Sequence, residues 1–332
     1  MTVAPQAPTS ADRFRSHRLR VEQVRREAEG VVALTLADPA GAELPVWTAG
    51  AHVDLVLPSG LVRQYSLCGD PADRSTFTVA VLRESGGRGG SVEIHDSALV
   101  GRELDVRGPR NHFELRPAPS YLFLAGGIGV TPLLTMATAV SAAGVPWTLH
   151  YGGRSRRHMA FATRLGAIGG ERVHLIPQDE LGLPDLGGIV AAAPGDAAVY
   201  ACGPEGMLRA VERACAEATP PRQLRVERFA SGRSTAPVRD EGGAGEFEVA
   251  LRRTGVAVRV PADRSVLDAV RDVVPDVPSS CEEGFCGSCE VPVLEGTPDH
   301  RDQILTPEEQ EESATMMICV SRCRGPRLVL DL

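Results

Sequence analysis

The stretch Cys281-Glu-Glu-Gly-Phe-Cys286-Gly-Ser-Cys289 contains three cysteines in a C-x4-C-x2-C pattern, and a fourth, Cys319, follows 30 residues after the third. This spacing is typical of a plant-type [2Fe-2S] cluster, in which four thiolates hold two iron atoms. The loop of such a site wraps closely around the cluster and points backbone N–H groups at its sulfurs, which favours small residues between the ligands. Because the spacers here include glycine and serine, the pattern predicts a [2Fe-2S] site with the ligands Cys281, Cys286, Cys289 and Cys319.

A structural zinc site and a disulfide framework are the alternative roles for these cysteines. Zinc ligands usually come as closely spaced pairs, and Cys319 has only Cys323 close by. Disulfides form in oxidising compartments, whereas residues 1–30 are polar and arginine-rich, without the apolar core of a signal peptide. We therefore expect a cytoplasmic protein with reduced thiols. The remaining cysteines are expected to be buried as small apolar side chains; they are Cys68, Cys202, Cys215 and Cys323.

The composition is that of a globular protein of two or three domains, with 332 residues and 43% hydrophobic content. All 35 basic residues are arginines, so a phosphate site must use arginine, hydroxyl or backbone N–H groups. Residues 246–332 hold 17 acidic residues and 9 arginines, which accounts for the whole net charge of -8. This negative charge disfavours nucleic-acid binding. It either assists docking onto a basic protein surface or simply keeps the domain soluble.

Residues 117–149 carry no charged side chain, which raises the question of a membrane span. The pattern within them argues against one, because the apolar run 121–124 is followed by a glycine-rich turn and then by a helix that opens at Thr131-Pro132. A buried parallel strand that leads into a helix explains the run without lipid. We therefore expect no membrane partner.

Residues 18–116 are predicted to form an antiparallel β-barrel or β-sandwich. Short runs of alternating apolar and polar residues are separated by clusters of glycine, proline and aspartate, as is typical of both folds. The clearest runs lie at 19–24, 31–36, 53–57 and 77–81.

Two stretches within this region suggest a cofactor site. Arg63-Gln-Tyr65-Ser66-Leu67 lies at a strand end, and Gly87-Arg88-Gly89-Gly90-Ser91 precedes a short helix. An arginine, an aromatic ring and a hydroxyl suit a flat anionic cofactor, whose phosphate Arg88 and Ser91 would bind at the helix start. Taken singly, such stretches are more often a solvated strand arginine and an ordinary glycine loop.

Residues 117–230 alternate between predicted strands and helices, the pattern of a doubly wound parallel α/β sheet. The glycine turn Ala125-Gly-Gly-Ile-Gly-Val-Thr131-Pro132 follows the first strand, although it is not the G-x-G-x-x-G fingerprint. Cys202-Gly203-Pro204 ends a later strand at the same carboxyl edge, where such sheets bind ligands. We expect strands near 121–125, 146–151, 172–176, 197–202 and 223–227, and helices over 130–142, 156–167 and 204–217.

Residues 231–245 are polar and rich in glycine and charge, which predicts a linker. Beyond it, alternating runs predict a hairpin of strands at 247–251 and 256–260. Ser265 is expected to open a helix that reaches Val273, ahead of the cysteine loop. Cys319 is expected to close a strand that begins at Met316.

Taken together and in this order, the Arg63-x-Tyr65-Ser66-Leu67 stretch, the glycine turn, the Cys202-Gly-Pro stretch and the four-cysteine pattern resemble the phthalate dioxygenase reductase and vanillate demethylase reductase family. The resemblance runs from about residue 18 to Leu332. It implies three domains: a flavin-binding barrel at 1–116, an NAD(P)-binding domain at 117–230 and a C-terminal β-grasp ferredoxin-like domain at 246–332. It also implies an NAD(P)H-dependent reductase that passes electrons through FMN and the cluster to a separate oxygenase, either Rieske-type or cytochrome P450.

The resemblance also assigns site residues. The catalytic candidates are Ser66 near the reactive flavin nitrogen, Cys202 beside the nicotinamide and Phe229 over the flavin ring. NADH is favoured, although three arginines at 154–157 leave NADPH open, and FMN is favoured over FAD because we find no adenine platform. A monomer is expected. The cofactor-binding candidates are Arg63, Tyr65, Ser66, Leu67, Arg88, Gly90 and Ser91 for the flavin, and Gly127, Thr131, Arg154, Cys202, Gly203 and Pro204 for the nucleotide.

Two other functions remain open from the sequence. A redox-sensing iron-sulfur flavoprotein would carry the same cofactors but would oxidise pyridine nucleotides negligibly in the steady state. An FAD diaphorase would have no dedicated partner. The scattered histidines show no spacing typical of an oxygenase centre, so the oxygenase is expected to be a separate protein.

Overall fold

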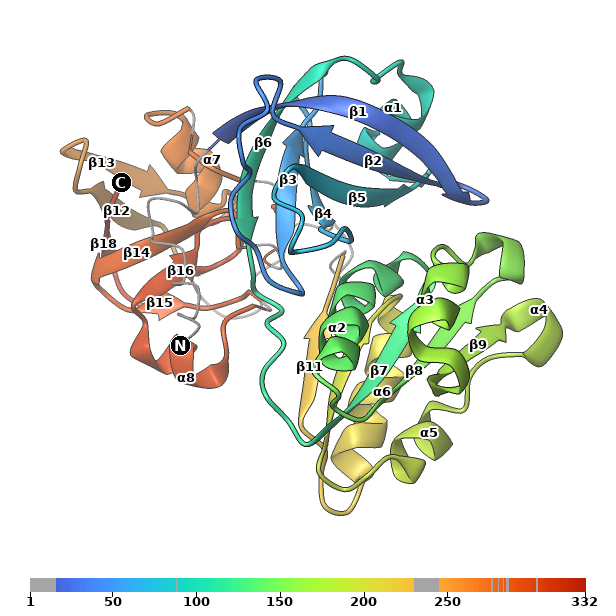
Figure 1. Ribbon diagram of the computed structural model, residues 1–332. Coiled ribbons are helices and arrows are strands. Elements are labelled where there is room, and N and C mark those ends of the chain that lie inside the picture. Colours follow the sequence, from blue (N-terminus) through green and yellow to red (C-terminus); the bar gives the residue numbers. More distant parts are fainter. Residues whose placement is uncertain are drawn as a thin grey trace, which may run out of the picture. The chain divides into compact units, whose positions relative to one another are not determined.

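The computed structural model describes residues 16–229 except Arg88, and residues 245–332 except Asp276, Ser280, Glu283, Phe285, Cys286 and Gln303. The chain divides into two compact units, Met1–Arg228 and Phe229–Leu332. Figure 1 shows their helices and strands. Within the described residues, no helix combines the length and the apolar character needed to cross a bilayer.

The first unit begins with a six-stranded antiparallel sheet in the order β4-β3-β6-β1-β2-β5. A bridge between Leu67, just after β4, and Val79 of β5 joins the two edges, so the sheet closes into the predicted barrel. Alternate side chains such as Leu19, Val53 and Val106 fill its interior and are fully buried. The strands are β1 (Ser16–Ala28), β2 (Val31–Ala37), β3 (His52–Val56), β4 (Val62–Ser66), β5 (Thr76–Leu82) and β6 (Glu103–Arg110), with the helix α1 (Gly90–Asp96) between the last two.

The second sheet of this unit is parallel, in the order β11-β10-β7-β8-β9. Every residue of the central strand β7 is buried, because helices cover both faces (Figure 1). Phe123 packs with α2 and α3 on one face, whereas Leu122 and Leu124 pack with α5 and α6 on the other. The elements are β7 (Ser120–Gly126), α2 (Val130–Ala142), β8 (Trp147–Gly153), α3 (Ala162–Gly169), β9 (Val173–Pro177), α4 (Gln178–Leu181), α5 (Leu186–Ala192), β10 (Ala197–Cys202), α6 (Glu205–Glu217) and β11 (Leu224–Glu227).

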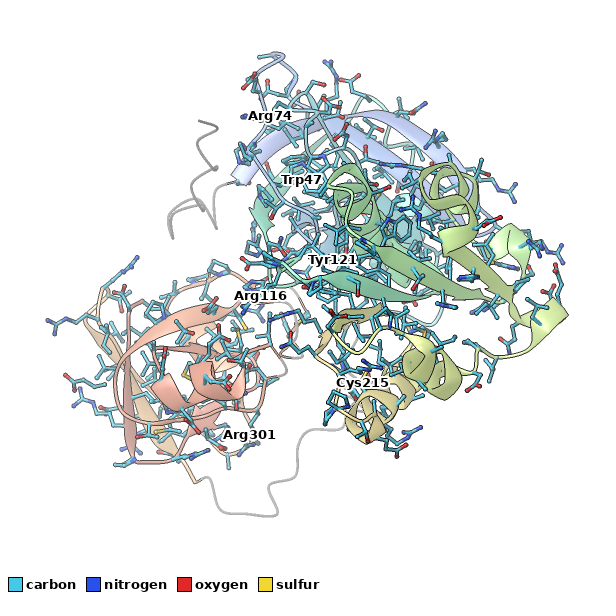
Figure 2. All side chains as sticks on the ribbon, turned by 60° about the horizontal axis from the view of Figure 1, so that its bottom comes forward. Trp47, Arg74, Arg116, Tyr121, Cys215 and Arg301 are labelled. Atoms are coloured by element: carbon cyan, nitrogen blue, oxygen red, sulfur yellow. The ribbon has the colours of Figure 1, made fainter. Side chains whose placement is uncertain are left out.

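Hydrogen bonds from side chains to backbone carbonyl groups tie the barrel to the parallel sheet. Tyr121 donates its hydroxyl to the carbonyl oxygen of Arg116 at 2.9 Å, on the connection between β6 and β7 (Figure 2). Arg164 of α3 donates to the carbonyl oxygens of Cys68 and Gly69 at 2.9 and 3.3 Å. The Arg164 bonds therefore hold α3 against the residues that directly follow β4.

The helix predicted over 156–167 is wrong in its first half. A single 3-10 turn covers Arg156–His158, and α3 starts only at Ala162. Phe161 has a left-handed backbone with φ of 60°, which interrupts the helix. Met159 and Phe161 are buried, so packing of this segment onto the core overrides its local helical pattern.

The second unit contains a mixed five-stranded sheet in the order β13-β12-β18-β14-β16, in which β12 and β18 are parallel. Ser265 caps α7 by accepting a hydrogen bond from the backbone N–H of Asp268 at 3.0 Å. The residues Leu267 and Val270 of α7 pack into the core of this sheet, as in a β-grasp fold. The elements are β12 (Phe247–Leu251), β13 (Val256–Val260), α7 (Val266–Arg271), β14 (Glu290–Glu295), β15 (Pro298–Asp299), α8 (Pro307–Glu312), β16 (Thr315–Met317), β17 (Arg322–Cys323) and β18 (Arg327–Leu330).

The three predicted architectures are thereby confirmed: an antiparallel barrel, a doubly wound parallel sheet and a β-grasp unit. A second local expectation is also wrong, because β16 ends at Met317 and Cys319 lies in the turn that follows. The predicted domain boundaries stay predictions, and the linker at 231–245 falls almost entirely outside the described residues.

Candidate functional site

The two stretches predicted to bind the flavin meet in space. A Cβ atom added to Gly90 would lie 2.6 Å from both Cγ and Nε of Arg63, so the start of α1 packs directly on the arginine side chain of β4. The hydroxyl of Ser91 accepts a hydrogen bond from the backbone N–H of Glu84 at 3.0 Å. Arg88 lies outside the described residues. The arrangement fits an anionic group held by Arg63 and the adjacent backbone.

Tyr65 and Leu67 differ in how they present their side chains. Tyr65 is partly buried, and burial raises the pKa of its hydroxyl, so the hydroxyl remains a hydrogen-bond donor at neutral pH. Leu67 points into the barrel core, and its N–H donates to the carbonyl oxygen of Ala51 at 2.8 Å. A contact from Leu67 to a cofactor is therefore limited to its carbonyl group.

Ser66 lies beside a carboxyl group that the sequence analysis did not select. Its hydroxyl donates to Oε2 of Glu227 at 3.4 Å, and Glu227 pairs in parallel register with Cys202. Burial raises the pKa of Glu227 to about 8, although its surface remains partly exposed. Burial, and then the charge of Glu227, raises the pKa of the Cys202 thiol well above its usual range. The predicted catalytic residues Ser66 and Cys202 thus both neighbour Glu227, Ser66 through a hydrogen bond and Cys202 through strand pairing.

The glycine turn and the Cys202-Gly203-Pro204 stretch touch each other at the carboxyl edge of the sheet. A Cβ atom on Gly129 would lie 2.2 Å from the carbonyl oxygen of Cys202, and one on Gly126 would lie 2.6 Å from Cδ of Pro204. Only glycine permits this approach. Gly127 adopts φ of 54° with open space around it. The hydroxyl of Thr131 donates to the carbonyl oxygen of Ile128 at 3.0 Å and holds the turn.

The basic segment at the end of β8 is largely neutralised by acidic partners. Nε of Arg156 lies 3.0 Å from a carboxylate oxygen of Glu180, and Nε of Arg157 lies 3.4 Å from a carboxylate oxygen of Glu29. Arg154 is exposed, and among the described residues its guanidinium has no ion-pair partner. One cation of the three therefore remains available for a nucleotide.

Three of the four predicted cluster ligands converge. Cys281, Cys289 and Cys319 are buried, and hydrogen bonds with the other two thiols, together with burial, strongly raise the pKa of Cys319. Cys286 lies outside the described residues, and within those residues no group of three or more Cys, His, Asp or Glu side chains is arranged as a complete metal site. The convergence of these three thiols nonetheless fits the role of cluster ligands better than the role of isolated structural cysteines.

Cys323 faces a different turn from the three convergent thiols. Its sulfur accepts a hydrogen bond from the N–H of Gly325 at 3.2 Å and lies 3.5 Å from the carbonyl oxygen of Arg327. Every cysteine that the structure describes is a free thiol. Phe229, predicted to cover the flavin ring, is 40% exposed at the start of the second unit, and its role stays a prediction.

Comparison with known proteins identifies the family. Residues 249–324 match the model of the 2Fe-2S iron-sulfur cluster binding domain. The sequence is 45% identical to the phenoxybenzoate dioxygenase subunit beta of Ectopseudomonas oleovorans, over 95% of this chain and 97% of that protein. The solved structure of phthalate dioxygenase reductase matches with a TM-score of 0.67 and 34% identity, over 96% of this chain and 98% of that one. The chain belongs to the phthalate dioxygenase reductase family.

The chain is also similar to part of a larger enzyme. An intact type IV self-sufficient cytochrome P450 monooxygenase matches with a TM-score of 0.87 and 45% identity, over 96% of this chain. The chain spans only 41% of the length of that P450 protein. Membership of the phthalate dioxygenase reductase family confirms the resemblance inferred from the motifs.

Proposed function

We propose that the chain is an NAD(P)H-dependent reductase that delivers electrons through a flavin and a [2Fe-2S] cluster to a separate oxygenase. The observation that carries this proposal is that one chain joins two sites. In one, Ser66, Glu227 and Cys202 meet at the edge of a nucleotide-type sheet. In the other, three buried thiols converge in the spacing of a cluster.

A bound flavin supplies the exchange between the two-electron hydride of a nicotinamide and the single electrons that an iron-sulfur cluster accepts. The chain's own residues position the reactants and handle protons. The Ser66 hydroxyl and the Glu227 carboxyl form a pair that holds a proton near neutral pH, because the pKa of Glu227 is raised to about 8. The Cys202 thiol stays neutral and presents a small uncharged surface at the same edge.

The finer cofactor assignment is FMN with NADH. Arg63 and Ser91, with the undescribed Arg88, are proposed to hold a single terminal phosphate. NADH is proposed because Arg156 and Arg157 are paired with acidic residues and leave only Arg154 for the ribose 2′-phosphate that distinguishes NADPH from NADH. Chromatography of heat-released flavin tests the first assignment. A kcat/KM for NADPH tenfold or more above that for NADH would overturn the second.

The proposed electron acceptor is a terminal oxygenase of Rieske or cytochrome P450 type. The similar proteins include both a dioxygenase subunit and a P450 monooxygenase, which supports an oxygenase partner without choosing between the two types. The monomeric state and the cytoplasmic location expected from the sequence remain proposals.

Turnover with an artificial acceptor tests the proposed function. The purified chain should catalyse reduction of cytochrome c by a pyridine nucleotide, and Cys319→Ser should slow this while leaving reduction of the flavin intact. A chain that oxidises neither NADH nor NADPH would contradict the reductase function and favour a redox sensor.

A further inference from the structure

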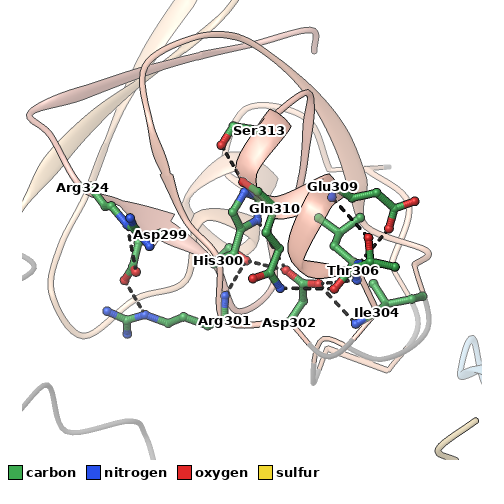
Figure 3. A network of polar contacts seen from close by, with 12 residues as sticks. Asp299, His300, Arg301, Asp302, Ile304, Thr306, Glu309, Gln310, Ser313 and Arg324 are labelled. Carbon is green, nitrogen blue, oxygen red and sulfur yellow. Dashed lines mark hydrogen bonds and ion pairs between the residues drawn. The ribbon is translucent and has the colours of Figure 1, made fainter. Parts of the chain in front are cut away.

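A buried carboxylate lies in the second unit next to the cysteine loop. The side chain of Asp302 is 0% exposed. Its Oδ2 accepts hydrogen bonds from the backbone N–H groups of Ile304 and Leu305 at 3.3 and 2.9 Å, and its Oδ1 accepts one from the hydroxyl of Ser321 at 3.4 Å (Figure 3). Donors that point at both oxygens are typical of an ionised carboxylate.

Asp302 touches both segments that carry the predicted cluster ligands. A Cβ atom on Gly284, within the cysteine loop, would lie 3.2 Å from Cα of Asp302 and 2.6 Å from Cγ2 of Val320. Val320 and Ser321 directly follow Cys319. The backbone of Asp302 therefore lies against the cysteine loop, and its carboxylate contacts Ser321, two residues after Cys319.

No cation among the described residues offsets this charge directly. His300 lies close by, with its Nδ1 3.6 Å from Oδ1 of Asp302, and within the part of the chain that the structure describes neither of its buried ring nitrogens has a hydrogen-bond partner. Asp299, three residues earlier, differs because it pairs with two arginines (Figure 3). Its Oδ2 lies 2.8 Å from Nε of Arg301, and its Oδ1 lies 3.7 Å from Nε of Arg324. The two aspartates thus provide one uncompensated and one compensated charge on the same segment.

We propose that Asp302 sets the reduction potential of the cluster by placing a fixed negative charge beside its binding loop. The proposal rests on the proposed function only in requiring that the chain binds the cluster. Reduction adds one electron to a cluster, and the potential depends on nearby charge, hydrogen bonds and exposure. An uncompensated carboxylate in the interior disfavours the added electron and lowers the potential, which helps the electron to leave for an acceptor.

The test is the midpoint potential of the cluster in the full-length chain carrying Asp302→Asn. The amide oxygen can accept the N–H bonds of Ile304 and Leu305, while the amide nitrogen can donate to Ser321 and His300, so only the charge is lost. A dithionite titration with mediators, followed by electron paramagnetic resonance, should show the equilibrium for one-electron reduction shifted roughly tenfold toward the reduced form, about 59 mV. The potential of the flavin should not move.

Two further variants separate charge from structure. Asp299→Asn changes the net charge equally, and its shift should be less than a third of that of Asp302→Asn, because the Asp299 side chain is 28% exposed and solvent screens its charge, whereas that of Asp302 is fully buried. Ser321→Ala removes one hydrogen bond to Asp302 but no charge, so the potential should fall or stay constant. A rise in Ser321→Ala, or equal shifts in the two Asn variants, would overturn the proposal.

A purely structural role has its own signature. In that case Asp302→Asn would lower the unfolding temperature and leave the potential unchanged. If Asp302→Asn binds no cluster, Asp302→Ser is measured instead, and loss of the cluster in both variants, with retention in Asp299→Asn, would also contradict the proposal. Absence of a cluster from the unaltered chain would instead contradict the proposed function.

Discussion

At the scale of single residues, Glu227 shows how burial turns an ordinary side chain into a proton-holding group. Burial raises its pKa from 4.5 to about 8, while Ser66 donates a hydrogen bond to it. The folded chain binds this proton more tightly than the unfolded chain. Between about pH 4.5 and 8, the stability contributed by the protonated carboxyl is therefore lost as the pH rises.

This linkage predicts the behaviour of Glu227→Gln. The amide still accepts the Ser66 hydrogen bond but does not titrate, so the unfolding temperature should fall less between pH 6 and pH 8.5 than in the unaltered chain, by a difference on the order of a few °C. Thermal unfolding followed by circular dichroism measures this. The exposed Glu217 in α6 provides the control substitution Glu217→Gln. Identical pH slopes in Glu227→Gln and the unaltered chain would refute the assignment.

The fourth cluster ligand can also be tested one residue at a time. Cys319→Ser should abolish or alter the visible spectrum of the cluster, because Cys319 hydrogen-bonds with Cys281 and Cys289. Cys323→Ser should leave the spectrum intact, because that sulfur is bonded within a separate turn. Iron content and visible absorption of the two variants are the measurements, and the reverse result would reassign the ligand.

At the scale of elements, the glycine turn after β7 depends on close backbone approach. Gly129→Ala would place a Cβ atom 2.2 Å from the carbonyl oxygen of Cys202, which cannot move like a flexible side chain. We expect a loss of roughly 1–3 kcal/mol in stability, with weaker nucleotide binding. Gly166 in α3 has open space around it, so Gly166→Ala is the matched control and should be neutral or stabilising. Equal denaturant midpoints for both variants would contradict the packing argument.

The sequence predicted the elements that local sequence pattern determines better than those that tertiary packing determines. The five parallel strands lie within two residues of their expected positions. The first of them contains a continuous apolar run at 121–124 bounded by glycine, which signals a buried strand strongly. The helix over 156–167 failed because burial of Met159 and Phe161 is a tertiary effect. Glu227 was missed for a related reason. Its importance comes from the parallel register with Cys202 and from contact with Ser66, both distant in sequence.

At the scale of the whole molecule, the acidic charge of residues 246–332 predicts salt-sensitive delivery of electrons to a basic partner. The charge of Glu282 is partly neutralised by Arg271, whose Nη2 lies 2.6 Å from Oε1 of Glu282. Glu283 lies outside the described residues. The exposed glutamates of α8 are therefore better candidates for attraction; they are Glu308, Glu309, Glu311 and Glu312.

Transfer to the oxygenase should slow as salt is added, because attraction between surface charges is screened over roughly 8–10 Å at physiological ionic strength. Reduction of the flavin by bound nucleotide should change far less. Replacing Glu308, Glu311 and Glu312 by Gln should flatten the salt dependence of transfer, measured by rapid mixing at several ionic strengths. Reversing Glu282 and Glu283 to Arg is the companion variant. An unchanged rate and salt slope in both would show that the acid charge only keeps the chain soluble.

The central claim is that electrons pass within this one chain from nucleotide to flavin to cluster. Anaerobic rapid mixing of the loaded protein with NADH tests it most directly, with flavin absorbance and the paramagnetic signal of the reduced cluster followed together. The account predicts that flavin absorbance falls first and that the cluster signal then rises, whereas Cys319→Ser shows only the first change. A cluster that stays oxidised while the flavin of the intact protein is fully reduced would contradict the account.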